Sequence, residues 1–423
     1  MCPPHWAADY GTSILKSRGG LTRKRDLRHG RAVWKSFRSP PAVGTRLRRA
    51  TRADVVIVGA GISGAILAQS LTEAGLRPLL VERRRAALLG STAASTALLQ
   101  FELDAPLTQL SRRIGAKAAG QVWIASRDAV NELRTRSHRL NIDAAFASRP
   151  SLYLAGNLLD ARGLRREVRL RQKIGLASEY LDRRSLRHHF GIDREAALLN
   201  HGNAEANPVQ LAAGYLRCAL HAGAQLRAPH EIVDLHCCSG GIELVTEDGI
   251  EIKAAHVVLC TGYELAKIVP PAHNRMISTW AIATRPQPEA IWPQRALIWE
   301  SSEPYLYLRS TDDGRVICGG EDAEFSDPVK RDQLTETKAR RIAAKLRRLM
   351  PALDVRPQYA WTGTFGASST GMPTIGEIPG YPNCYAVMGY GGNGITFSML
   401  ASRLITAAIC KRKLPEADLF GFR

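Results

Sequence analysis

A glycine-rich turn between a short apolar run and a helix constrains this chain more than any other feature of its sequence. Residues 53–58 (ADVVIV) are rich in valine and isoleucine, which is typical of a buried parallel strand. The sequence GAGISG follows at residues 59–64, and a helix is predicted over residues 62–74. Residues 78–82 (PLLVE) predict a second buried strand. This order predicts a β-α-β unit in a parallel sheet and an α/β fold class.

The same unit predicts a Rossmann-type binding site for a dinucleotide. In a GxGxxG turn the first glycine allows a tight bend, the second lets the backbone approach a pyrophosphate, and the third lets helix and strand pack closely. The helix N-terminus offers N–H groups and partial positive charge to the phosphates. The acid that ends the second strand can accept hydrogen bonds from ribose hydroxyls. The predicted cofactor-binding residues of this unit are Gly59, Gly61, Ile62, Ser63, Gly64, Glu82 and Arg83.

The charge of the chain is concentrated at its N-terminus. The chain carries 58 Lys and Arg against 39 Asp and Glu, and residues 1–52 alone hold 13 basic and 2 acidic side chains. Such a segment suits nucleic acid, an anionic membrane surface or targeting, and a solvated tail is the interpretation we favour. We therefore expect residues 1–52 to be a basic, partly disordered extension, with ordered structure beginning near Asp54.

The cysteines and the apolar runs indicate in which cellular compartment the protein is expected and whether it spans a membrane. None of the eight cysteines forms a CxxC pair, so we expect reduced thiols, no metal site and a cytoplasmic location. No uncharged apolar run reaches the roughly 18 residues of a membrane span, and none is predicted.

The remaining residues predict a second, discontinuous domain. Residues 106–150 and 160–190 show helical periodicity, residues 277–320 alternate short strand-like runs with turns, and a basic amphipathic helix is predicted over 329–350. We expect an α+β substrate domain on a mixed or antiparallel sheet. The predicted division assigns residues 53–145, 200–272 and 355–423 to the cofactor domain, and residues 146–199 and 273–354 to the substrate domain.

Several separated motifs, in this order, resemble the D-amino-acid oxidase family of FAD-dependent oxidoreductases. The resemblance runs from Asp54 to Ile409. After the GxGxxG unit, it rests on GSTAAST at 90–96, Asn207-Pro208 before a helix, VVLCTG at 257–262, GMPTIG at 371–376 and GYGGNGI at 389–395.

This resemblance implies an FAD cofactor lying along both ends of the chain. It implies that the helix opened by residues 391–395 directs N–H groups at the pyrimidine edge of the flavin, where reduced flavin carries negative charge. Residues 361–366 (WTGTFG) contain no Cys or His, so non-covalent FAD is expected. The cofactor contacts that the resemblance adds are Thr92, Ser95, Val233, Thr261, Gly262, Gly391, Gly392, Asn393, Gly394 and Ile395.

The predicted substrate residues are Tyr305, Tyr307 and Arg309. Alternation with a period of two places them on one face of a strand, where the tyrosines can frame a substrate and Arg309 can pair with a carboxylate. A solvent-facing or interdomain strand face is the alternative. Some members of the family carry an arginine for the carboxylate in the segment 361–366, and this chain does not.

These features predict an FAD-dependent oxidoreductase that oxidises the C–N bond of an amine or amino acid. A hydride leaves the α-carbon for flavin N5, and water hydrolyses the resulting imine; O₂ or another acceptor then reoxidises the flavin. The expected partner is a small molecule, and no nucleic acid is expected. Two alternatives remain open: a tRNA-modifying oxidoreductase of the same fold, in which the basic extension binds phosphates, and a non-catalytic flavoprotein subunit.

Overall fold

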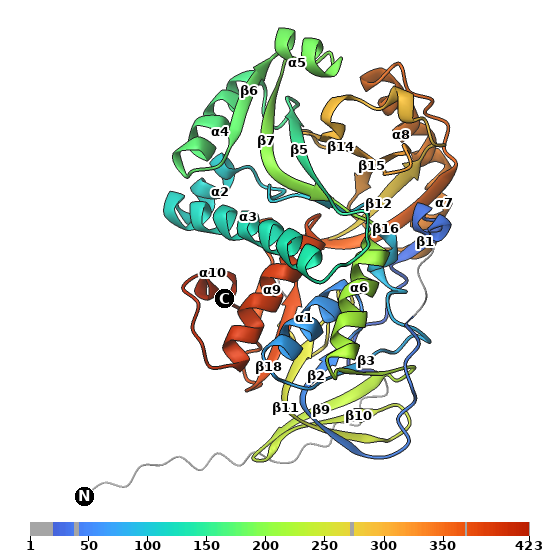
Figure 1. The fold of residues 1–423 in the computed structure, drawn as a ribbon, viewed down its shortest axis with the longest axis vertical. Helices are drawn as coiled ribbons and strands as arrows, with labels where there is room; N and C mark the ends of the chain where they lie inside the picture. The colour runs from blue at the N-terminus through green and yellow to red at the C-terminus, as the bar shows by residue number, and fades with distance from the viewer. Residues whose placement is uncertain (1–19, 38–41, 271–274, 369, 423) are drawn as a thin grey trace, which may run out of the picture.

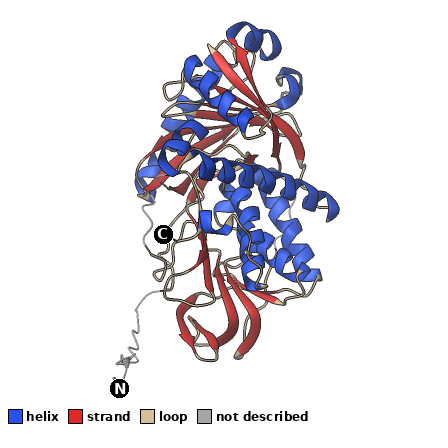
Figure 2. Cartoon of the chain, turned by 90° about the vertical axis from the view of Figure 1, so that its left-hand side faces the viewer, coloured by secondary structure: helices blue, strands red, loops and turns tan. Residues whose placement is uncertain are grey.

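The computed structural model describes residues 20–37, 42–270, 275–368 and 370–422. Two large sheets lie at the lower and upper ends of the molecule in Figure 1, with the long helix α3 (Ala116–Arg139) running between them. Figure 2 shows from the side that helices fill the space between the two groups of strands. The predicted α/β class, with a second sheet of different character, is confirmed. The exact division of the chain into domains stays a prediction.

The lower sheet is built around the predicted β-α-β unit, which is confirmed. Strand β2 (Thr51–Val58), helix α1 (Ile62–Glu73) and strand β3 (Pro78–Val81) follow one another, and β2 and β3 pair in parallel. The strand order is β17-β18-β11-β2-β3-β8, and the β9–β10 hairpin joins β11 antiparallel. The other strands are β8 (Gln225–Arg227), β9 (Ile232–Cys238), β10 (Gly241–Thr246), β11 (Glu251–Leu259), β17 (Thr374–Glu377) and β18 (Cys384–Met388).

Both faces of the lower sheet are buried, which explains the unbroken apolar run of β2. Val55 and Ile57 pack into one core cluster with the helices, whereas Val56 and Val58 pack into another with the β9–β10 hairpin. Each fully buried side chain of this kind contributes roughly 1.5–3 kcal/mol relative to an exposed one. The helices on the first face are α1, α3, α6 (Pro208–His221) and α9 (Gly394–Ile409).

The upper sheet has ten strands and is antiparallel except where β13 pairs in parallel with β5. Its order is β1-β16-β12-β15-β14-β13-β5-β7-β4, with β6 beside β7. The strands are β1 (Arg28–Gly30), β4 (Leu98–Leu99), β5 (Ala147–Leu154), β6 (Ser178–Asp182), β7 (Ala196–Glu205), β12 (Arg275–Ala283), β13 (Leu297–Glu300), β14 (Leu306–Ser310), β15 (Val316–Ala323) and β16 (Tyr359–Ala367). A mixed, mainly antiparallel sheet is what the sequence predicts for this half.

The remaining helices lie around the upper sheet and near the C-terminus. They are α2 (Leu107–Ile114), α4 (Ala161–Lys173), α5 (Arg183–Phe190), α7 (Pro328–Gln333), α8 (Thr335–Leu349) and α10 (Ala417–Phe420), with 3-10 turns at Val33–Ser36, Ser91–Ala94, Pro288–Ala290 and Pro293–Arg295. Within the described ranges, no helix combines the length and the apolar character that crossing a membrane requires.

The prediction of helix throughout residues 160–190 is wrong in the middle. Strand β6 lies there and pairs antiparallel with β7. Gly175 adopts a positive φ of 81° just after α4, so the helix cannot continue through it. The side chain of Asp182 then accepts a hydrogen bond from the Ser185 N–H, which starts α5 afresh. The prediction of one helix over residues 329–350 also needs correction, because α7 and α8 divide at Leu334.

The prediction that ordered structure begins near Asp54 is wrong, because residues 20–37 form an N-terminal strap against both sheets. The Leu21 N–H donates to the Ile232 carbonyl at 3.1 Å, and β1 pairs with β16. Apolar side chains between the basic ones explain the packing: Val33 is fully buried and Trp34 is 5% exposed. The part of the predicted disordered extension at residues 1–19 and 38–41 lies outside the described residues.

We predict that Trp34→Ala lowers the free energy of unfolding by about 3–5 kcal/mol, the usual cost of deleting a buried aromatic side chain. The Trp34 indole Nε1 also donates to the Ser95 carbonyl at 2.6 Å, and the substitution leaves that oxygen without its donor. Val43→Ala is the control, because Val43 is 70% exposed and its loss should cost less than about 0.5 kcal/mol. Urea unfolding followed by circular dichroism gives both values, and equal losses would show that the strap is not packed.

Candidate functional site

A cavity of about 820 Å³ is lined by residues of both sheets. It begins at the GxGxxG turn, passes the loop over residues 90–97 and ends among strands β12, β14 and β15. Its volume is in the range of pockets that enclose a cofactor or a drug-sized ligand. Most of the predicted site residues meet here, from segments far apart in the chain. Those that line the cavity are Gly59, Gly61, Ile62, Ser63, Glu82, Arg83, Thr92, Ser95, Thr261, Gly262, Tyr305, Tyr307, Gly391, Gly392, Asn393, Gly394 and Ile395.

The GxGxxG turn depends on a close approach of two backbones. Gly59 has a φ of +105°, and a Cβ on Gly64 would lie 2.1 Å from the Gly59 carbonyl oxygen. Gly64 therefore lies beneath the turn rather than on the cavity wall, as its predicted packing role requires. Only glycine fits there, and this contact sets the N-terminus of α1 at the carboxyl end of β2.

Glu82 holds the turn from the next strand. Its side chain is 5% exposed, Oε2 accepts from the Ala60 N–H at 3.0 Å, and Oε1 accepts from the Arg84 N–H at 2.8 Å. Two backbone donors thus stabilise the buried carboxylate. Each oxygen keeps a further lone pair that can accept a hydrogen bond from a ribose hydroxyl.

The loop of small residues lies against the start of α1. The Thr92 hydroxyl accepts from the Ile62 N–H at 3.0 Å, so it satisfies one unpaired donor of the helix N-terminus. Ser95 Oγ accepts from the Ala97 N–H at 3.1 Å, which keeps the loop turned along the cavity. Small side chains are needed because bulkier ones would fill the slot.

Val233 is not among the residues that line the cavity, and its predicted backbone contact with the adenine stays a prediction. The lining residues in this stretch are His230, Glu231 and Ile232. Strand β9 begins at Ile232, and Val233 is the next residue, whose side chain points to the other face of the strand.

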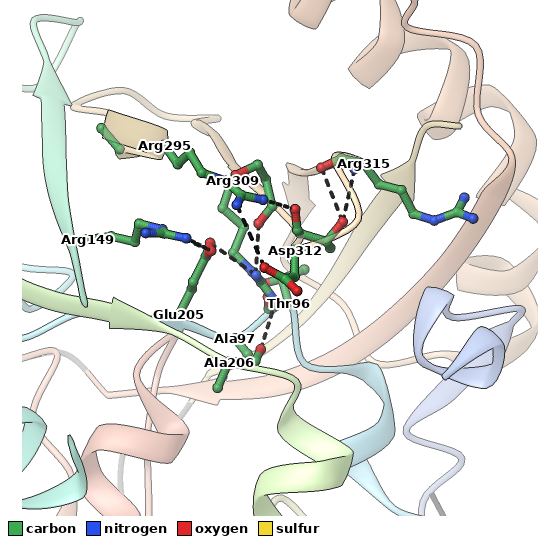
Figure 3. Close-up of polar contacts among 12 residues, drawn as sticks. Thr96, Ala97, Arg149, Glu205, Ala206, Arg295, Arg309, Asp312 and Arg315 are labelled. Atoms are coloured by element: carbon green, nitrogen blue, oxygen red, sulfur yellow. Dashed lines mark hydrogen bonds and ion pairs between the residues drawn. The ribbon is translucent and has the colours of Figure 1, made fainter. Parts of the chain in front are cut away.

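Arg309 does not line the cavity, and the prediction that it binds a substrate carboxylate is wrong. Figure 3 shows Arg309 together with its polar contacts to Glu205 and to neighbouring parts of the chain. Nε donates to the Thr96 carbonyl at 2.7 Å, one Nη donates to Glu205 at 3.2 Å, and the other donates to the Ala206 carbonyl at 2.8 Å. Arg149 also pairs with Glu205, at 2.9 Å. Arg309 is 2% exposed and anchors the loop that lines the cavity.

The glycine-rich start of α9 reaches the cavity, as predicted, and meets an acid that the sequence did not predict there. The Gly392 N–H donates to Asp104 Oδ2 at 3.1 Å. Burial raises the pKa of Asp104, and this hydrogen bond lowers it in part. Gly391 has a φ of +54°, and a Cβ there would lie 2.3 Å from the Asp104 carboxylate. The negative charge of Asp104 and the positive helix end therefore stabilise each other.

Seven buried polar atoms of residues that line the cavity lack any hydrogen-bond partner within the described part of the chain. Such atoms are rare in folded proteins, and they are expected where a polar ligand supplies the missing partner. They are Arg83 Nη1, Gln100 Nε2, Glu102 Oε2, His230 Nδ1, Glu231 Oε1, Trp299 Nε1 and Asp322 Oδ1. Gln100 ends the stretch of small residues that begins at Gly90, and that position was its only signal in the sequence. Two further wall residues, Thr22 and Leu27, come from the N-terminal strap.

The far end of the cavity is lined by two tyrosines and an acid. The Tyr305 and Tyr307 rings lie 5.7 Å apart, so the predicted pair is brought together. Asp322, at the end of β15, lines the same compartment. Burial raises the pKa of Asp322 to about 6, while hydrogen bonds from Thr279 and Tyr305 partly oppose the shift. No motif in the sequence analysis singled out Asp322.

One cluster of metal-ligand type occurs in the described ranges: His230, Glu247 and Asp248. The Leu47 N–H donates to His230 Nε2 at 2.8 Å, so the ring proton is on Nδ1. Nδ1 lies 3.5 Å from Asp248 and directs that proton toward it. The ring offers no free lone pair to a cation in this arrangement.

Comparisons with known proteins agree on one family. Residues 54–408 match the family model DAO, described as FAD dependent oxidoreductase. The chain is 25% identical over 389 residues to γ-glutamylputrescine oxidoreductase of Escherichia coli, covering 89% of this chain and 87% of the relative. The fold matches glycine oxidase from Geobacillus kaustophilus with a TM-score of 0.70 at 20% identity, covering 86% and 96% of the two chains. It matches L-proline dehydrogenase from P. horikoshii with a TM-score of 0.72 at 18% identity, covering 88% and 97%.

We predict that Gly64→Ala disrupts the turn and lowers the flavin content of purified protein, because the new methyl group collides with the Gly59 carbonyl. Overpacking of this kind typically costs about 1–3 kcal/mol of stability. Gly240→Ala is the matched control, since nothing lies within 4 Å of the added atom. The ratio of visible to protein absorbance measures the outcome, and equal flavin content in the two variants would contradict the role of the turn.

We also predict that Arg309→Leu lowers the free energy of unfolding by about 3 kcal/mol or more, because it leaves the buried Glu205 carboxylate with one cation fewer. Arg183→Leu, which breaks an exposed pair with Asp193, should cost less than about 1 kcal/mol. Thermal and urea unfolding measure both variants. A substrate KM that rises in Arg309→Leu with no loss of stability would restore Arg309 as a substrate residue.

Proposed function

From the premise that this chain belongs to the DAO family of FAD-dependent oxidoreductases, we propose that its cavity holds FAD non-covalently and that it oxidises the C–N bond of a small amine or amino acid. The observation that carries the proposal is the continuity of the cavity. One slot connects a dinucleotide-type turn, a glycine-rich helix start and a compartment with two tyrosines and an acid. The substrate is expected at that last compartment.

The residues along the slot fit the parts of FAD. The α1 N-terminus and Gly61 suit the pyrophosphate, and Glu82 suits the ribose. The unpartnered Gln100 amide offers a donor to the cofactor or the substrate. At the other end, the first turn of α9 has N–H groups without intrahelical acceptors, and these favour a negative charge beside them.

Non-covalent binding is supported by the state of the one cysteine and the one histidine on the described cavity wall. Within the described lining these are Cys260 and His230. Burial raises the pKa of the Cys260 thiol to about 12, so it stays protonated and is a poor nucleophile. The His230 ring accepts a hydrogen bond at Nε2 from the Leu47 N–H, so its proton is on Nδ1 and the ring has no free lone pair with which to attack the cofactor.

Bound FAD supplies a two-electron acceptor. The chain itself orients the substrate: Tyr305 and Tyr307 frame the compartment, and burial raises the pKa of Tyr305 well above 10, so it stays a neutral hydrogen-bonding group. A substrate amine that binds as an ammonium ion must lose a proton and become neutral before its α-carbon gives up a hydride. Water then hydrolyses the imine to a carbonyl compound and ammonia or an amine. We propose O₂ or another acceptor for the reoxidation step, and a cytoplasmic location, which the free cysteines of the described chain support.

We predict that the purified protein shows the visible absorption bands of oxidised flavin, and that acid or heat releases this flavin into the supernatant. Under anaerobic conditions at least one member of a panel of amines and amino acids should bleach it. Protein that neither copurifies with flavin nor takes it up would refute the proposal. Bound flavin that no amine bleaches would favour the non-catalytic subunit, and salt-sensitive retention of tRNA would favour the tRNA-modifying enzyme.

A further inference from the structure

We propose that Asp322 binds the cationic amino group of the substrate, and that the substrate is an amine with no carboxylate on its reacting carbon. The inference rests on the proposed function and names the substrate class of the same site. Three observations support it. A bulge in the backbone directs Asp322 into the cavity, one oxygen of its carboxylate has no hydrogen-bond partner, and the nearby arginines are either engaged by the chain or exposed.

A β-bulge in β15 directs Asp322 into the cavity. The pairing of β12 with β15 shifts by one residue between Ser278 and Trp280, so β15 contains an extra residue there. Glu321 has a φ of +57°, which is rare for a residue with a side chain. Bulges and strained backbones of this kind are frequent beside active sites, where they re-aim a side chain.

The bulge is held in place by groups that do not face the cavity. Lys338 Nζ donates to the Glu321 carbonyl at 2.6 Å, and the Glu321 carboxylate pairs with Lys338 and Lys345. Gly320 adopts a φ of +137°, and a Cβ there would lie 2.2 Å from the Tyr305 carbonyl oxygen. Helix α8, which carries both lysines, thus fixes the strained residue Glu321, and the next residue, Asp322, lies on the cavity wall.

The Asp322 carboxylate is incompletely satisfied. Thr279 and Tyr305 form hydrogen bonds with it, yet Oδ1 is shielded from solvent and has no partner among the described residues. A buried acceptor without a donor is costly, and an ammonium group of a ligand would supply both a donor and a compensating charge. Asp104, which influences the charge of Asp322, adds a second acid to the compartment.

The arginines near this compartment are either engaged by the chain or exposed to solvent. Arg309 is saturated by the chain. Arg275 is 65% exposed and pairs with Glu324 at 3.1 Å, and Arg113 is exposed. Within the described ranges, no buried arginine faces Asp322, and the nearby Lys338 is already paired with the carbonyl and the carboxylate of Glu321. A carboxylate next to the substrate nitrogen would therefore meet two acids and a cation that another carboxylate already neutralises. An amine without that carboxylate avoids the repulsion.

The test uses amines that cannot be oxidised, because their nitrogen-bearing carbon has no hydrogen. Holoenzyme is titrated with 2-amino-2-methylbutane, with 2-aminoisobutyrate, which has a carboxylate in place of the ethyl group, and with the neutral 2-methyl-2-butanol. The change in flavin absorbance gives each Kd. The amine should bind at least about tenfold more tightly than the other two.

Asp322→Asn should weaken binding of 2-amino-2-methylbutane by about 10- to 100-fold while the flavin content is unchanged. Glu324→Gln is the matched control, because it removes an exposed acid two residues away and should change that Kd by less than about twofold. Equal losses in the two variants, or no loss in Asp322→Asn, would overturn the proposal.

A pH series on the wild-type protein tests the same point should Asp322→Asn fail to fold. The groups that face Asp322 are Asp104 from the loop before α2, Thr279 from β12, Tyr305 just before β14, Tyr307 from β14, and Lys338 from α8. The amine stays protonated from pH 8 to pH 5, whereas a carboxyl with a raised pKa of about 6 loses its charge over that range. Binding should therefore weaken about tenfold on acidification.

These experiments distinguish a failure of this inference from a failure of the proposed function on which it rests. Flavin that is reduced by amines, together with an amine Kd that depends neither on Asp322 nor on pH, would refute the inference and leave the proposed function intact. Protein that holds no flavin would refute both.

Discussion

The contact between Gly64 and the Gly59 carbonyl is the constraint on which the rest of the site depends. It brings the N-terminus of α1 onto the carboxyl end of β2, where unpaired N–H groups and the positive helix end can face phosphates. Glu82 then stabilises the turn by accepting a hydrogen bond from the Ala60 N–H, and the Thr92 hydroxyl accepts one from the Ile62 N–H. Each of these contacts needs the close approach that glycine alone permits.

Several acids line the cavity, and the hydrogen bonds that the chain gives to each of them distinguish their roles. Glu82 accepts from two backbone N–H groups and is part of the scaffold. Asp104 accepts from Gly392 and completes the start of α9. Asp322 keeps an oxygen without a partner and lies in the compartment farthest from the glycine turn. Because buried charge is costly unless it is paired, the acid that the chain satisfies least is the best placed to receive a cation.

The two halves of the molecule are joined by contacts around the cavity rather than by one continuous sheet. Arg309, from the upper sheet, binds the Thr96 carbonyl of the loop and lies over the Trp34 ring at 5.2 Å. Trp34 belongs to the strap and donates to the Ser95 carbonyl of the same loop. The loop is thereby clamped from both sides, which keeps the small residues along the slot in a fixed position.

Sequence alone determined the parts of the protein that local patterns encode. The β-α-β unit, the glycine turns at both ends of the chain and the tyrosine pair follow from spacing and residue type within short segments. The tertiary structure decided the rest. The alternation of side chains along a strand shows which residues share a face of the strand, but it does not show which groups pack against that face. Arg309 donates hydrogen bonds to the carbonyls of Thr96 and Ala206, which are far from it in the sequence. The strap packs through apolar residues that lie between basic ones. Asp322 is directed into the cavity by a bulge that becomes visible only in the pairing of β12 with β15.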